Sequence, residues 1–244
     1  MIELQTASGV VSVPTGMHEI SLSAYHDFLA VLRRSGLFSR MEDEEEEEQV
    51  SDTGLLPFID SLIEALGFVC SGELTALPVG NLEDSVLSEP SLLGVFSHVI
   101  DLATNFKPVR RIVPEVGYFF DYKGEVFGIS PERASAYVTG ITYTTAEAIE
   151  VLEADRILAQ KIAETTDPQG MFSFEMDLRR LAVLARKDGE ELPVQKVERE
   201  RWIDERARFL KEVSADVALE IRFFFIGILM RLVKEEIQTA FSRD

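Results

Sequence analysis

The stretches Ile20–Phe28, with the sequence ISLSAYHDF, and Ile141–Ile149, with the sequence ITYTTAEAI, follow one pattern. Each comes after a segment in which apolar and polar residues alternate, residues 2–13 in the first case and 118–129 in the second. In each stretch, two apolar residues separated by a spacer lead to a hydroxyl residue, and the next apolar anchor lies five positions beyond it. Alternation is the period of a strand, and a hydroxyl residue before an apolar helical face is a helix cap. The sequence therefore predicts two small β-hairpins, each followed by a capped helix.

The first hairpin is expected over residues 2–14, with its turn at Gly9. Ser21 or Ser23 can cap the helix that follows, which should stop near Ser35 and Gly36. Two further apolar helices are expected in this half of the chain, separated by a loop or a short acidic helix at residues 73–88. They span residues 55–69 and 91–105.

The second hairpin pairs residues 118–122 with 125–129 around Lys123 and Gly124. After a loop, Thr144 or Thr145 is expected to cap a helix of about twenty residues, and with Thr144 as the cap Glu147 completes a capping box. The last third is expected to be helical, over residues 172–186, 194–212 and 214–241. The fold class is thus α+β and mostly helical, with a helical C-terminal third. Two units are expected, a hairpin with helices over residues 1–106 and a hairpin followed by a helical bundle over residues 107–244.

Negative charge is concentrated in the first unit. The formal net charge is −19, and residues 1–106 hold 18 acidic side chains against three arginines and no lysine. The remainder holds 25 acidic and 21 basic side chains, an ordinary mixed surface. Binding to phosphate backbones requires clustered cations, so direct nucleic-acid binding is not expected. A basic protein partner or adaptation to high salt fits this charge better.

Seven consecutive acidic residues at 42–48 contribute much of this charge. They lie within residues 41–53, which we expect to form a disordered acidic loop. The run is either a solvated linker or a docking segment for a basic partner. In the second case the residues that set the electrostatic interaction with that partner are Glu44, Glu45, Glu46, Glu47 and Glu48.

No arrangement of residues identifies a reaction. Cys70, His98 and Asp101 could be combined as nucleophile, base and orienting group, but a cysteine at the end of an apolar helix usually packs as a small apolar residue. The three histidines do not form the i, i+4 pair that holds zinc, and the acid run lacks the spacing of a calcium loop. Phosphate-binding glycine motifs are also absent from the sequence. We therefore expect no enzymatic activity, no catalytic residue, no cofactor and no metal.

The last predicted helix contains an apolar run of eight residues, Phe223–Met230, bounded by Arg222 and Arg231. A bilayer span needs about 20 apolar residues, so no membrane insertion is expected. The run is apolar on every side, which implies burial within the chain's own core, self-association, or contact with an apolar partner segment. For the last two cases the expected contact residues are Phe223, Phe224, Phe225, Ile226 and Met230.

The stretch from Ile20 to Leu29, the hairpin at 118–129 and the stretch from Tyr143 to Glu153 together resemble tail-region proteins of bacteriophages, and among these the tail-assembly chaperones. The resemblance covers residues 1–32 and 110–156, and the long acid run and the large helical C-terminal third depart from it. It implies a nonenzymatic assembly protein of the host cytoplasm, or of the virion, that shields apolar segments of a tail component. The alternatives are a homo-oligomeric structural protein of the virion and, third, a cytoplasmic hydrolase using Cys70 and His98.

Overall fold

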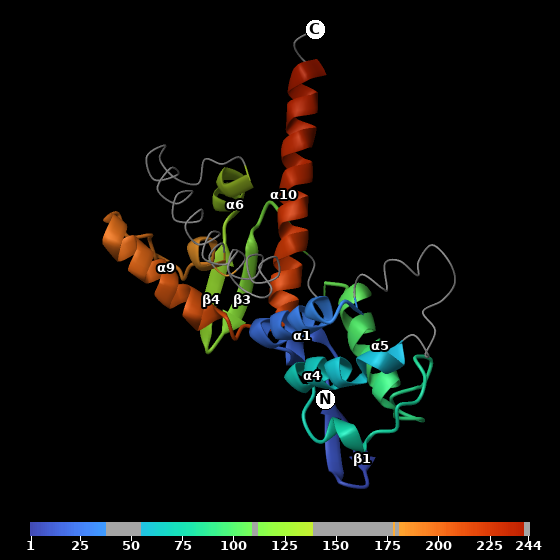
Figure 1. Ribbon diagram of the computed structural model, residues 1–244. Helices are drawn as coiled ribbons and strands as arrows, with labels where there is room; N and C mark the ends of the chain where they lie inside the picture. Colours follow the sequence, from blue (N-terminus) through green and yellow to red (C-terminus); the bar gives the residue numbers. More distant parts are fainter. Residues whose placement is uncertain (38–54, 109–111, 139–177, 179–180, 242–244) are drawn as a thin grey trace. The chain divides into compact units, whose positions relative to one another are not determined.

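The computed structural model of the chain describes residues 1–37, 55–108, 112–138, 178 and 181–241 (Figure 1). The described residues are a mixture of helices and two antiparallel two-stranded sheets, with a helical C-terminal region, which confirms the α+β prediction. They fall into two compact units, one ending at Lys107 and the other beginning at Pro108. The acid run, the helix predicted after Thr144 and most of the helix predicted at 172–186 lie outside the described residues.

The first unit opens with the predicted hairpin, in which β1 (Ile2–Thr6) pairs with β2 (Gly9–Val13). Residue alternation sets its two faces, and Leu4, Val11 and Val13 point to the buried one. The hairpin is fastened to the chain beyond α4 by two backbone hydrogen bonds between Ser12 and Ser71, at 2.8 and 3.0 Å.

Helix α1 (Leu22–Arg34) begins at Ser21, whose Oγ accepts a hydrogen bond from the backbone N–H of Ala24 at 3.1 Å. Of the two predicted caps, Ser21 is therefore the one that is used. Phe28 and Leu32 are fully buried on the inner face of α1. The helix ends before Gly36, whose φ of +80° is the left-handed conformation that terminates helices.

The other predicted helices of this unit are also present. A 3₁₀ turn, η2 (Leu56–Phe58), leads into α4 (Ile59–Val69), and α5 (Leu92–Thr104) begins at the cap Ser91. α4 packs on α1, and the ring of Phe28 lies 6.5 Å from that of Phe96 on α5, so one core joins the three helices. Two more 3₁₀ turns are η1 (Met17–Glu19) and η3 (Leu74–Ala76), and residues 77–88 form an irregular loop.

Gly72 gives a test of this unit, because it has both a positive φ of +102° and no room for a side chain. A Cβ atom built there would lie 2.2 Å from the Val10 carbonyl oxygen, which is backbone and cannot move alone. Gly72→Ala is expected to destabilise the unit by about 3 kcal/mol or more, since strain and a clash add. Gly36→Ala, with a φ of +80° and no atom within 4 Å, should lose only about 1 kcal/mol. Equal losses in urea unfolding would contradict the close approach of the hairpin.

In the second unit, β3 (Tyr118–Tyr122) pairs with β4 (Glu125–Ile129) through the predicted Lys123–Gly124 turn. Both turn residues have positive φ, +52° and +77°, as a tight hairpin of this kind requires. Phe120 and Phe127 face each other across the strands with ring centroids 5.5 Å apart, and both are buried. Of the five hairpin aromatics, only Phe119 is largely exposed, so the rings serve chiefly as core.

The loop predicted after this hairpin is wrong, because α6 (Pro131–Val138) begins immediately. Ser130 caps it by accepting a hydrogen bond on Oγ from the backbone N–H of Arg133 at 3.2 Å. Proline at the first helical position fits, since the amide hydrogen it lacks would have no partner there. The second hairpin is thus followed directly by a capped helix that the sequence pattern did not predict.

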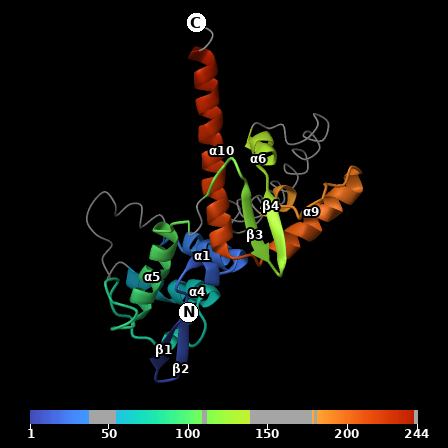
Figure 2. The same ribbon diagram turned by 180° about the vertical axis from the view of Figure 1, so that it is seen from behind.

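Two long helices complete the second unit, α9 (Lys196–Leu210) and α10 (Ala215–Phe241). From α9, the ring of Phe209 contacts Tyr122 and Phe127, at 5.0 and 6.0 Å between centroids. α10 runs beside β3 and α6 and extends past them, as Figures 1 and 2 show. It is joined to β3 by a buried hydrogen bond of 2.7 Å from the Tyr118 hydroxyl to the Glu220 carboxylate.

Candidate functional site

α10 has two apolar faces on opposite sides. Its buried face packs within the second unit and consists of Val217, Ile221, Phe224 and Ile228. At about 100° of rotation per residue, a second apolar set points the opposite way, with exposed fractions of 53%, 50%, 68% and 47%. We call this set the outer stripe: Ile226, Leu229, Met230 and Val233. Its spacing of i, i+3, i+4 and i+7 is that of a helix face that packs against another element.

The five contact residues predicted from the sequence divide between these faces. Phe224 is fully buried, with its ring 6.2 Å from that of Tyr118, and belongs to the core. Phe225 is half-buried and Phe223 is 43% exposed, both beside the outer stripe. Ile226 and Met230 are members of it. The chain's own described residues therefore cover the apolar run on one side only.

Leu229 and Val233 are not among the contact residues predicted from the sequence, although they are 50% and 47% exposed on the same face of α10. Their spacing from Ile226 and Met230 was available in the sequence. The sequence does not show on which side of α10 the elements β3 and α6 pack, because a run that is apolar all round does not indicate which face is covered. The predicted acidic contacts, Glu44 to Glu48, lie outside the described residues.

The cysteine considered as a nucleophile is in an unsuitable environment. Cys70 is buried at the end of α4, and burial raises the pKa of its thiol to about 12. A nucleophilic cysteine needs a lowered pKa, because the thiolate is the reactive form. His98 has its Nε2 atom 2.9 Å from the Pro14 carbonyl oxygen, and Asp101 is exposed. The structure therefore gives the Cys70, His98 and Asp101 set no activated thiol.

We expect the native Cys70 thiol to resist alkylation by iodoacetamide at pH 8. A pKa of about 12 in place of 9.0 leaves about 10³-fold less thiolate than in the unfolded chain. Mass spectrometry of the native protein should show labelling slower by about that factor than in 8 M urea. Comparable rates in the two conditions would show that the thiol is accessible and ionisable.

Within the part of the chain that the structure describes, no group of three or more histidine, cysteine, aspartate or glutamate side chains is arranged to hold a metal ion. His18 is exposed in η1, His26 is buried on α1, and His98 lies on α5.

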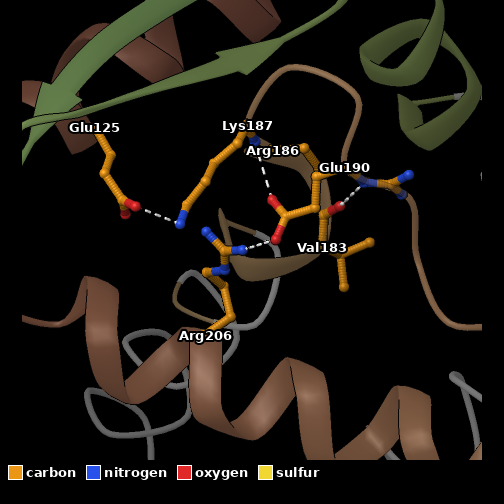
Figure 3. A network of polar contacts seen from close by, with 6 residues as sticks. All are labelled: Glu125, Val183, Arg186, Lys187, Glu190 and Arg206. Atoms are coloured by element: carbon orange, nitrogen blue, oxygen red, sulfur yellow. Dashed lines mark hydrogen bonds and ion pairs between the residues drawn. The ribbon is translucent and has the colours of Figure 1, made fainter.

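A network of ionic side chains joins β4, residues 183–190 and α9 (Figure 3). Lys187 Nζ lies 2.6 Å from Glu125 Oε1, and the backbone N–H of Lys187 donates to Glu190 Oε2 at 2.9 Å. Arg206 pairs with Glu190 and also stacks on Phe127, 5.0 Å from its ring centroid. Each of these carboxylates faces a cation, so the network is well suited to holding residues 183–190 against the hairpin. The outer stripe is therefore the strongest candidate for a functional site.

Of the described helices, α10 included, none has the length and apolar content that crossing a bilayer takes. Comparison of the chain with protein-family models, with curated proteins and with solved structures finds no match.

Proposed function

We propose that the chain is a nonenzymatic bacteriophage assembly protein, similar in role to the tail-assembly chaperones, which shields an apolar segment of a tail component. The observation that carries this proposal is the outer stripe of α10. Four large apolar side chains, each about half exposed or more, form one contiguous helical face. Apolar residues scattered singly over a surface are ordinary, whereas a contiguous apolar face marks a contact with another polypeptide.

The form of the stripe favours a helical client segment. Residues at i, i+3, i+4 and i+7 anchor a helix in an apolar groove or against another helix. The client would then be an amphipathic helix of a tail protein, whose own apolar face is covered until assembly. The charge of the first unit adds to this role, because 18 acidic side chains against three arginines in residues 1–106 keep a complex from aggregating by mutual repulsion.

Co-expression with the proteins of the neighbouring genes tests the proposal. The tagged chain should retain one identified tail protein, and Ile226→Glu combined with Met230→Glu should lose it. Val197→Glu is the matched control, because Val197 is an 81% exposed valine on α9 away from the stripe. Retention of the tail protein by the double variant, or no retention by the wild type, would refute the proposal.

Washed, purified particles distinguish the chaperone from a structural protein of the virion. A chaperone leaves before the particle is complete and should be absent there. Stoichiometric presence of the chain in the particles would favour the homo-oligomeric virion protein, in which the same stripe makes a permanent subunit contact.

A further inference from the structure

The residue spacing of the outer stripe is the same in both directions along α10. Its members are spaced three, one and three residues apart, so reversing the helix reproduces the spacing. Two copies of α10 placed antiparallel would bring Ile226 opposite Val233 of the other copy and Leu229 opposite Met230 of the other copy. Each of these layers combines two apolar side chains of different shape, which favours interdigitation over the stacking of identical residues.

We infer that a second copy of this chain covers the outer stripe, by antiparallel pairing of α10, whenever no client occupies it. The inference rests on the proposed function, since it names what protects the same face before the client arrives. The interface would be isologous, with one two-fold axis passing between Leu229 and Met230. Client binding and self-association would then exclude each other.

The exposed area gives the size class of this interface. If fully exposed side chains of this size offer roughly 150–200 Å² each, four that are half exposed offer on the order of 400 Å² per copy, about half of a standard interface. Phe223 adds to this at the margin, because it is 43% exposed beside the stripe. An interface of this size is typical of a weak, reversible dimer. Such a dimer can give way to a client that fits better.

The charge of the second unit permits the approach of two copies. Residues 107–244 carry 25 acidic and 21 basic side chains, so this part of the chain is close to neutral. The strongly negative part is confined to residues 1–106. The four side chains of the stripe itself are uncharged, so pairing removes apolar surface from water without burying an ion.

Sedimentation of the full chain in the absence of any client tests the inference. Between roughly 1 and 200 µM, the weight-average mass of the wild type should rise from the monomer value towards twice that value. Ile226→Glu combined with Met230→Glu should stay at the monomer value, and Val197→Glu should follow the wild type. A wild type that stays monomeric throughout, or a double variant that still associates, would overturn the inference.

Disulfide trapping tests the antiparallel arrangement. A mixture of Ile226→Cys and Val233→Cys chains should form a covalent dimer on mild oxidation, and Ile226→Cys alone should not. The native Cys70 is buried and offers no accessible thiol. Trapping of Ile226→Cys alone with the same yield as the mixture would overturn antiparallel pairing. If the wild type is always monomeric and still retains a tail protein, self-pairing is refuted and the proposed function is not. If the wild type dimerises and retains no tail protein, the proposed function is refuted and self-pairing is not.

Discussion

Phe127→Ala is expected to destabilise the second unit by about 3–5 kcal/mol, the cost of removing a fully buried aromatic ring and leaving a cavity. Phe127 has no exposed surface and stacks on Phe120 at 5.5 Å. Its ring also lies 6.0 Å from that of Phe209 and 5.0 Å from the Arg206 guanidinium carbon. One substitution therefore loosens the hairpin, α9 and the ionic network of Figure 3 together.

Urea unfolding followed by tryptophan fluorescence measures this loss, because the single tryptophan, Trp202, lies on α9 in the same unit. Val126→Ala is the control, one residue away on the opposite face of β4 and 57% exposed. It should change the free energy of unfolding by less than about 1 kcal/mol. Similar losses for the two variants would contradict the orientation of the hairpin faces.

The second large effect is expected on binding at the outer stripe. Ile226→Glu with Met230→Glu should weaken the association of the chain with its client, and with itself, by on the order of 100-fold or more. Two carboxylates would enter an apolar contact without partners, at a cost of at least about 3 kcal/mol, and every 1.4 kcal/mol is tenfold in affinity. Equilibrium sedimentation and titration of the captured tail protein give the two constants.

The same double variant should leave the fold unchanged. Ile226 and Met230 are 53% and 68% exposed, and glutamate is a good helix former. Thermal unfolding should stay close to that of Val197→Glu, which carries one comparable charge on α9. If the double variant is as stable as this control and still binds as tightly as the wild type, the stripe is not the contact surface.

Local chemistry made much of the fold predictable. The Lys123–Gly124 pair marks a turn, and Ser21 and Ser91 each mark the start of a helix. Both kinds of signal depend only on a few neighbouring residues. The predicted loop after the second hairpin does not include α6, although serine followed by proline, as at Ser130 and Pro131, is a helix-start pattern.

What depended on distant residues could not be predicted. Charged side chains favour the exposed side of a helix, yet on α9 Arg199 is only 2% exposed and Arg206 only 9% exposed. The burial of Arg206 depends on Glu190 and Phe127, which come from other segments of the chain. The two faces of α10 differ for the same reason, since Phe224 and Ile226 are both apolar and the side on which β3 and α6 pack decides which one is buried.

Site-specific photo-crosslinking tests the central claim, that another polypeptide covers the outer stripe, most directly. A benzophenone amino acid placed at Met230, in the full chain co-expressed with the tail proteins, should give adducts with a tail protein, and in the chain expressed alone it should give a crosslinked dimer. The same probe at Val197, which is 81% exposed on α9, provides the background. Adducts at position 230 well above that background are the predicted result, and equal yields at the two positions would contradict the account.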